Sequence, residues 1–480
     1  LFESTAAENI GAMILGFSVY AVTGQVGFVF FPLIARALGL LAGIAGIMTV
    51  KLRNENENPM KALNRGYYIT AVLALILFGY AASVLLGPTW PYFFGCGIIG
   101  VVLSIAIVYI TQYYTSGDYR PVRDIAKASE TGAATNIITG FSVGLETTAL
   151  PIISIAVALL ASYSLGWMAT SVPSQQFIYG LYGTAVATMG MLATCAFILA
   201  EDTFGPITDN AGGIVEMSDQ PEEIRKRTDR LDAIGNTTKA LTKGYAMGSA
   251  ALAAYLLFGA YFDRVLEILR AGNPALTLHD VFVVDIANPP VFVGAMIGAM
   301  LVFLFASLAI RAVGKAAGEM IAEVRRQFRE NPNILHGNDK PDYARCVDIS
   351  TKGALKAMIL PGILPVIVPV ALGLLMRFTY TGVANQTVAY QSVGALLMVG
   401  TIAGVLMALV MNNGGGAWDN GKKYIEAKGL KKTPQHAAAV VGDTVGDPFK
   451  DTAGPSLHVL VKLLSTITLV FASLFVVLQT

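Results

Sequence analysis

The sequence predicts an all-α polytopic membrane protein with about eleven transmembrane helices in a single membrane domain, residues 1–480. Hydrophobic residues make up 54% of the 480 residues and charged residues only 14%, and the mean hydropathy is +0.60. A helix needs about 20 mainly apolar residues to cross the hydrocarbon core of a bilayer. Eleven segments meet this requirement: residues 3–24, 26–50, 67–87, 92–114, 133–161, 177–201, 240–262, 290–312, 353–377, 391–412 and 456–478.

The charges of the connecting segments predict how these helices are oriented. The connections rich in Lys and Arg are 51–66, 116–130, 202–243, 313–352 and 413–436. The connections between them that carry no charge are 88–91, 162–176 and 378–390. Because cytoplasmic connections carry the excess of Lys and Arg, the basic set is predicted to be cytoplasmic. We expect the membrane to be a bacterial inner membrane.

Several helices are expected to continue beyond the bilayer on the cytoplasmic side. Residues 313–328 carry apolar residues at helical spacing, with no helix breaker before Pro332. Similar continuations precede residue 353 and follow residues 201 and 412. These extensions would form a cytoplasmic cap that can hold a polar site.

The most informative polar segment is GDTVGDPFKDT, residues 442–452, directly before the last apolar segment. Asp443, Asp447 and Asp451 are spaced i, i+4 and i+8, so in a helix their carboxylates share one face. Lys450 lies between the last two, and divalent cations holding a phosphate-containing ligand would offset the remaining repulsion. A solvated acidic helix end is the alternative, although carboxylates are costly beside a membrane segment.

A second polar segment, residues 201–217, ends the sixth apolar segment. Asp202 and Asp209 are seven residues apart, which places both on one face of a helix. The alternative is that Asp209 caps a new helix after a break at Gly205-Pro206.

A third polar segment, residues 231–244, enters the seventh apolar segment. Asn236 offers a neutral oxygen to a cation, and Lys239 and Thr242 face the same side of a helix at i, i+3. The alternative for Lys239 is an anchor at the membrane interface.

A fourth polar segment, NNGGGAWDNGKKYIE, covers residues 412–426. Asp419 and Asn420 can bind a cation, Lys422 and Lys423 suit phosphate, and the glycines let a ligand approach the backbone. The sequence has no G-x-x-x-x-G-K-[ST] motif, which argues against a nucleotide-driven pump.

These four segments place carboxylates, an amide and lysines at the same predicted ends of the apolar segments. The candidate site residues are Asp209, Asn236, Asp419, Asp443, Asp447, Asp451, Lys422, Lys423 and Lys450. Carboxylate oxygens with water and phosphate are the ligands that Mg²⁺ prefers, and two such ions could support hydrolysis of a phosphoanhydride. The net charge of +1 argues against nucleic acid as a partner.

Few ionisable residues lie within the apolar segments. Lys462 is in the last one, near His458, and Glu3 is in the first, with Glu8 about one turn further on. Such residues are functional candidates in a membrane, although a carboxylate in the first turn of a helix can also simply suit the helix dipole.

These motifs resemble the membrane-embedded inorganic pyrophosphatases that couple pyrophosphate hydrolysis to ion pumping. The matching segments are LFES at the start, TGAATN at 131–136, FGPITDNAGGIVEM, DRLDAIGNTTKALTKG, EVRRQF at 323–328, PDYARCVDIS at 341–350, GGAWDNGKKYIE and GDTVGDPFKDTAGPSLHVLVK. They span almost the whole chain in order. The resemblance implies sixteen helices per subunit in the complete protein, a homodimer, Mg²⁺, and pyrophosphate, protons and the lipid bilayer as partners.

The resemblance also implies roles for individual residues. Asp209, Asn236, Asp419 and Asp447 would hold Mg²⁺ and pyrophosphate, with Asp202, Asp443 and Lys423 as further groups near the site. Lys422 and Lys450 would contact phosphate, and Asp451 would polarise the attacking water. Lys462 and Glu3 would form the ion gate, and Lys239 with Thr242 would mark the K⁺-independent, proton-pumping subclass.

The resemblance further implies that part of the family's catalytic machinery lies upstream of LFES. A chain of these 480 residues alone is therefore expected to be inactive. The alternatives that stay open are a Na⁺-pumping pyrophosphatase, a pyrophosphatase without coupling, and a cation transporter or channel without chemistry.

Overall fold

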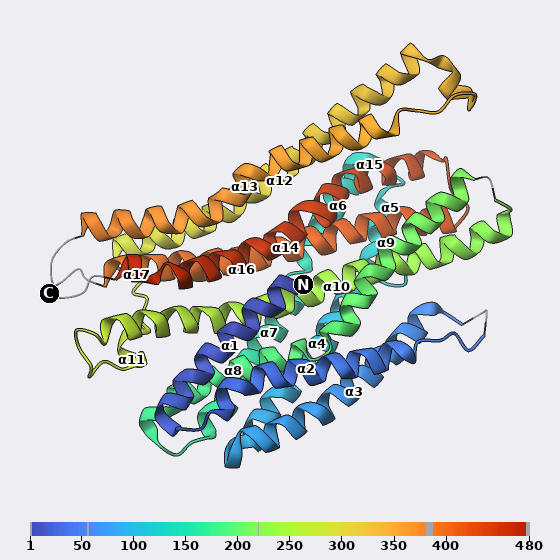
Figure 1. The fold of residues 1–480 in the computed structure, drawn as a ribbon. Helices are drawn as coiled ribbons and strands as arrows, with labels where there is room; N and C mark the ends of the chain where they lie inside the picture. The colour runs from blue at the N-terminus through green and yellow to red at the C-terminus, as the bar shows by residue number, and fades with distance from the viewer. Residues whose placement is uncertain (1, 55–56, 219, 381–386, 477–480) are drawn as a thin grey trace.

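The structure, a computed structural model, describes residues 2–54, 57–218, 220–380 and 387–476, without the side chains of residues 2–4, 233 and 236. Within these ranges the chain forms helices and connections and no strand. The long helices lie side by side as an elongated bundle (Figure 1). The predicted all-α fold is confirmed.

The helices follow one another with mostly short connections. In the first half they are α1 (Phe2–Thr23), α2 (Gly27–Met48), α3 (Pro59–Leu85), η1 (Gly87–Thr89), α4 (Trp90–Thr115), α5 (Arg120–Ala128), α6 (Ala133–Glu146), α7 (Ala149–Met168), α8 (Pro173–Leu192) and α9 (Cys195–Met217). In the second half they are α10 (Glu222–Leu269), α11 (Leu278–Val281), α12 (Pro289–Glu330), η2 (Pro332–His336), α13 (Tyr343–Thr379), α14 (Val388–Ala427), α15 (Pro434–Pro448), the π-helical turn η4 (Phe449–Ala453), α16 (Gly454–Val470) and α17 (Ala472–Phe475).

The number of membrane spans agrees with the sequence. Ten described segments are long and apolar enough to cross a membrane, and the bent pair α8–α9 makes eleven. The protein is thus a multi-pass membrane protein by length and composition of its helices.

Two predicted spans are not single straight helices. The span predicted at 133–161 is α6 and α7, separated at Thr147 and Thr148. Pro151 accounts for this break, because a proline ring clashes with the carbonyl group four residues earlier. The span predicted at 177–201 bends by 45° between α8 and α9, at Ala193 and Thr194, where the sequence has neither Pro nor Gly.

The most buried helices are in the middle of the bundle. The apolar window of α10 is 83% buried and that of α14 is 67% buried, whereas that of α13 is only 28% buried. In Figure 1 the α12–α13 pair and the α2–α3 pair lie at opposite edges of the bundle. The central helices α10 and α14 therefore carry the residues that can be shielded from both lipid and water.

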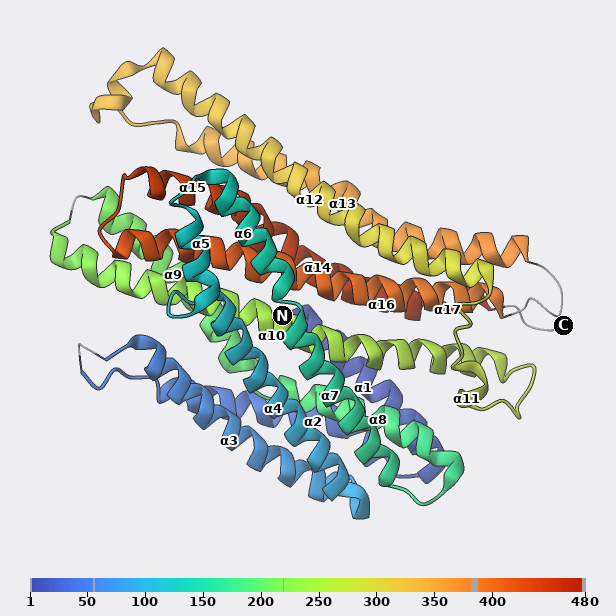
Figure 2. The same cartoon turned by 180° about the vertical axis from the view of Figure 1, so that it is seen from behind.

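All the connections predicted to be cytoplasmic lie at one end of the bundle. Figures 1 and 2 show α5, α15, the α9–α10 connection, the α2–α3 connection and the α12–α13 connection at this end, with α11 and α17 at the other. The predicted helix extensions are confirmed, because α9, α12 and α14 run on through the polar segments that follow their apolar parts. These extensions bring the four polar segments together.

Candidate functional site

Lys450 is the centre of the acidic cluster. Its Nζ lies 2.7 Å from Asp419 Oδ2 and 2.7 Å from Asp447 Oδ1. The same atom lies 3.4 Å from Asp443 Oδ1 and 3.9 Å from Asp451 Oδ2. The positive charge that offsets the predicted carboxylate repulsion is therefore supplied first by this lysine.

The π-helical turn η4 carries Asp451 and connects α15 to α16. α15 ends at Pro448, and residues 449–453 form the wider turn before α16. A proline cannot donate a backbone hydrogen bond, and single π turns are common at functional sites. Asp451 Oδ1 lies 3.0 Å from Nζ of Lys243 in α10, and its Oδ2 lies 3.9 Å from Lys450 Nζ, so Asp451 shares Lys450 with Asp443 and Asp447 and also contacts α10.

Two further lysines tie α14 to its neighbours. Lys422 Nζ makes a short ion pair with Asp443 of α15 and lies 3.7 Å from Asp419 Oδ1. Lys423 Nζ lies 2.8 Å from Oδ2 of Asp232 in α10 and 4.0 Å from Asp419 Oδ1. Asp419 is thus approached by three ammonium groups, those of residues 422, 423 and 450.

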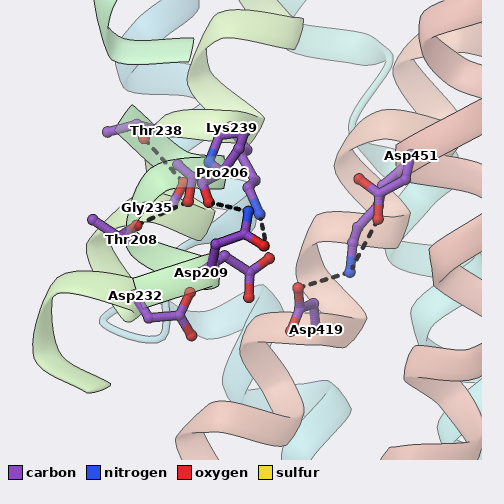
Figure 3. Close-up of polar contacts among 12 residues, drawn as sticks. Pro206, Thr208, Asp209, Asp232, Gly235, Thr238, Lys239, Asp419 and Asp451 are labelled. Carbon is purple, nitrogen blue, oxygen red and sulfur yellow. Dashed lines mark hydrogen bonds and ion pairs between the residues drawn. The ribbon is translucent and has the colours of Figure 1, made fainter. Parts of the chain in front are cut away.

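The helices α9 and α10 present a second set of contacts to the same region. Lys239 Nζ lies 2.8 Å from Asp209 Oδ2, and the Thr242 hydroxyl donates to Asp202 Oδ1 at 2.6 Å. Figure 3 shows Asp209, Asp232 and Lys239 on one side and Asp419 and Asp451 on the other. Asp209 lies inside α9, which passes through Pro206 without a break, so the N-cap interpretation of Asp209 is wrong.

A pocket joins these two sets of side chains. Its lining comes from α10, α14 and the η4 turn: Lys239, Ala240, Lys243, Asn412, Gly416, Asp419, Lys450 and Asp451. The lining holds three ammonium groups and two carboxylates, which is suited to an anionic ligand.

Carboxylates in this region are held mainly by lysines. Within the described ranges, no group of three or more His, Cys, Asp or Glu side chains is arranged to hold a metal ion. Of the predicted metal ligands, Asp209, Asp419 and Asp447 each lie in an ion pair, and the side chain of Asn236 is outside the described residues.

The membrane-embedded lysine has a carboxylate partner. Lys462 Nζ lies 2.5 Å from Glu8 Oε1, and the two side chains are only 6% and 0% exposed. Apart from this ion pair, neither the Lys462 Nζ atom nor the two carboxylate oxygens of Glu8 have a hydrogen-bond partner in the part of the chain that the structure describes. Glu3, the other residue predicted for the ion gate, has a side chain outside the described residues.

Sequence reasoning missed three residues that the structure brings into these contacts: Asp232, Lys243 and, as the partner of Lys462, Glu8. Lys243 follows Lys239 by four residues and so shares its helix face, a signal that the sequence carried. The Lys423–Asp232 and Lys462–Glu8 pairs join residues 191 and 454 positions apart, and only the packing of the helices reveals them.

Fold and site together define a class: a polytopic helical membrane protein with a lysine- and aspartate-lined pocket at the end where its basic connections gather. The chain belongs to the inorganic H⁺ pyrophosphatase family, whose model matches residues 1–471. This confirms the predicted family.

Named relatives are similar over nearly the whole chain. It is 60% identical to the K(+)-insensitive pyrophosphate-energized proton pump 2 of Moorella thermoacetica, with 99% of this chain and 67% of that protein covered. It is 59% identical to the K(+)-insensitive pyrophosphate-energized proton pump of Caldanaerobacter subterraneus, with 99% and 65% covered. It is 50% identical to the pyrophosphate-energized membrane proton pump 3 of Arabidopsis thaliana, with 99% and 60% covered. The chain therefore spans about two thirds of the length of these relatives.

Proposed function

We propose that this protein hydrolyses inorganic pyrophosphate to two phosphates and couples the hydrolysis to proton translocation across the membrane. The observation that carries the proposal is the pocket, in which the ammonium groups of Lys239, Lys243 and Lys450 face the carboxylates of Asp419 and Asp451. The printed names of the relatives above, which describe pyrophosphate-energized proton pumps, support the same activity.

The lysines would bind the substrate by exchanging partners. Phosphate oxygens are strong acceptors for ammonium groups, so pyrophosphate would replace Asp419, Asp443 and Asp447 around Lys422 and Lys450. This exchange frees the carboxylates for other ligands. Lys423 would stay close by, on Asp232.

Asp451 is the residue that we assign to polarise the attacking water. It is about half exposed, it borders the pocket, and its own contact with Lys243 holds one carboxylate oxygen while the other faces Lys450. The water oxygen would form a bond to one phosphorus atom as the bridging P–O bond breaks. Asp451 would take the proton of the water, and two phosphates would leave.

Mg²⁺ is the cofactor that we assign to this site. Mg²⁺ keeps several water ligands and is usually held by one or two carboxylates and the substrate's phosphates, so a protein cage of three carboxylates is not required. The carboxylates around Lys450 offer the right kind of oxygen. Asp209, Asn236, Asp419 and Asp447 would hold the ion, which supplies charge neutralisation of the phosphates.

We assign K⁺ independence to Lys239 and Thr242. The Lys239 ammonium lines the pocket and is held by Asp209, and Thr242 is held by Asp202 one helix over. A tethered ammonium beside the phosphates would supply the single positive charge that a bound K⁺ would otherwise provide. The K(+)-insensitive relatives support this subclass.

We assign proton gating to Lys462 and propose Glu8 as its partner, because their buried ion pair lies below the pocket within the helical bundle. Glu3, predicted for that role, stays an untested candidate. We further propose that the protein is a homodimer in a bacterial inner membrane. We also propose that the pocket faces the cytoplasm, because the basic connections gather at that end of the bundle (Figure 1).

The test is phosphate release from pyrophosphate with Mg²⁺ by purified protein, comparing Lys450→Met with Lys428→Met. Lys428 is a matched control because its ammonium lies over the Tyr424 ring, away from the pocket. Release that is lost in Lys450→Met and kept in Lys428→Met supports the proposal. The proposal would be contradicted if neither the chain itself nor the chain extended to the length of its relatives released phosphate.

The comparisons give no support to the expectation that these 480 residues alone are inactive. The same assay decides the matter, because phosphate release by the 480-residue chain would show the expectation to be wrong.

A further inference from the structure

His458 is a buried titratable residue that the hydrolysis proposed above does not use. It lies on α16 between the pocket and the Lys462–Glu8 ion pair, and it is 6% exposed. Its ring faces the backbone of Ala246 in α10, while its Nε2 has no hydrogen-bond partner among the described residues. Buried polar atoms are nearly always paired, so this nitrogen calls for an explanation.

The positions on α16 form a continuous buried line. Gly454, His458 and Lys462 are spaced i, i+4 and i+8, so they lie on one helix face about one turn, roughly 5 to 6 Å, apart. All three are buried. Lys462 carries the ion pair with Glu8 of α1, and it is the charged group next to the His458 ring on its own helix.

The pocket reaches this line through Asn412 of α14. Asn412 lines the pocket, and its Oδ1 also lies against Gly454, where a Cβ atom would approach it to 2.3 Å. Asn412 Oδ1 is itself buried and without a partner in the described part of the chain. An amide in this position can hold a water molecule that bridges the pocket to the next polar group, which on this face of α16 is His458.

We propose that His458 is a proton relay between the pocket and the Lys462–Glu8 pair. The proposal rests on the proposed function, since it needs the proton that pyrophosphate hydrolysis releases. The unpartnered Nε2 would accept that proton through water at Asn412 and then release it through water to the Glu8 carboxylate, so the imidazole returns to neutral while its other nitrogen stays on the Ala246 backbone. Imidazole suits this role because a ring nitrogen can accept a proton and release it again, which an amide does not do.

The surroundings of His458 favour this direction of transfer. From α10 the ring meets a backbone group, and the residue that joins the pocket to this line, Asn412 of α14, is an uncharged amide. The charged groups of the line, Lys462 and Glu8, lie beyond the ring. The Glu8 carboxylate, paired with Lys462, is the proton acceptor that lies beyond the ring along this line.

The first experiment measures two quantities in sealed vesicles for the full chain, phosphate release and acidification of the lumen, in wild type, His458→Gln and His458→Glu. His279→Gln is the matched control, because His279 packs on Phe177 at the opposite end of the bundle. We expect His458→Gln to keep phosphate release and lose acidification, His458→Glu to regain part of the acidification, and His279→Gln to match wild type.

Two results would overturn the relay. Acidification per phosphate that is unchanged in folded His458→Gln would show that protons bypass this residue. Loss of phosphate release together with acidification would show that His458 serves hydrolysis. Absence of phosphate release in the wild-type protein would instead contradict the proposed function. A failure of the relay and a failure of the proposed function therefore give different results.

A second experiment does not depend on the folding of a His458 variant. The sequence has four histidines, so replacing His279, His336 and His436 by Gln leaves His458 as the sole histidine. With ¹⁵N-labelled histidine, we expect the imidazole resonances to change when pyrophosphate and Mg²⁺ are added and turnover begins. Resonances that stay the same throughout turnover would refute the relay.

Discussion

Replacing Lys462 by Met should destabilise the protein strongly, because it leaves the Glu8 carboxylate buried without its partner. In the wild type the two groups are 2.5 Å apart, with Lys462 6% and Glu8 0% exposed. Removing one member of a buried ion pair costs about 3–5 kcal/mol, whereas replacing both members by uncharged residues of similar volume is often neutral. Lys462→Met is therefore expected to lose about 3–5 kcal/mol of unfolding free energy.

The assay is SDS-induced unfolding in mixed micelles, followed by helicity, for Lys462→Met, Glu8→Gln and the double variant. The double variant should recover most of the stability lost in Lys462→Met. Lys315→Met is the matched control, because Lys315 is 78% exposed and lies 4.0 Å from Glu319 on the surface of α12. An exposed pair of this kind contributes only about 0–1 kcal/mol.

Two outcomes would refute this reasoning. In the first, Lys462→Met is no more destabilised than Lys315→Met, which would mean that Glu8 is not left unpaired in a buried site. Alternatively, the double variant would be as unstable as Lys462→Met, which would mean that the loss comes from packing of the lysine side chain and not from its charge.

Three further predictions concern the pocket. Lys239→Ala should make phosphate release depend on K⁺, with about a tenfold lower rate in K⁺-free buffer for each 1.4 kcal/mol of lost charge stabilisation; rates equal with and without K⁺ would contradict the role of Lys239. Lys243→Gln should lower kcat about 10- to 100-fold with little change in KM, because Asp451 loses a charge-assisted hydrogen bond worth about 1.5–3 kcal/mol; a change in KM alone would argue against this. Gly454→Ala should impair acidification more than Ala453→Gly does, since a Cβ atom at position 454 would approach Asn412 Oδ1 to 2.3 Å. Acidification per phosphate in Gly454→Ala equal to that of wild type would contradict a path along Asn412.

Much of the fold could be predicted because apolar length is a strong signal. The spans and their cytoplasmic extensions follow from runs of apolar residues and from helical spacing, as in α12, where the pattern continues to the end of the helix at Glu330. The break before α7 could also be inferred from the sequence, because Pro151 lies at the start of that helix. The bend at Ala193 and Thr194 could not be predicted, because neither Pro nor Gly marks it in the sequence.

The site was predictable in part for the same reason. Local spacing was sufficient to group Asp443 with Asp447, and both do contact Lys450. Asp451, which the same spacing groups with them, lies 3.9 Å from Lys450 Nζ, but its closer contact with Lys243 of α10 could not be predicted, since a π turn sets the position of Asp451 and Lys243 lies on another helix. Lys462 was recognised as a candidate from its depth in an apolar segment, but its partner Glu8 lies on α1, far away in sequence.

The most direct test of the central claim uses wild-type protein in sealed vesicles with a pH-sensitive dye inside. Pyrophosphate and Mg²⁺ are added outside, and phosphate release and luminal pH are followed with and without K⁺ and Na⁺. The account predicts phosphate release with acidification of the lumen, both unaffected by K⁺ and Na⁺. Phosphate release that moves Na⁺ and no protons, or no phosphate release in any of these conditions, would contradict it.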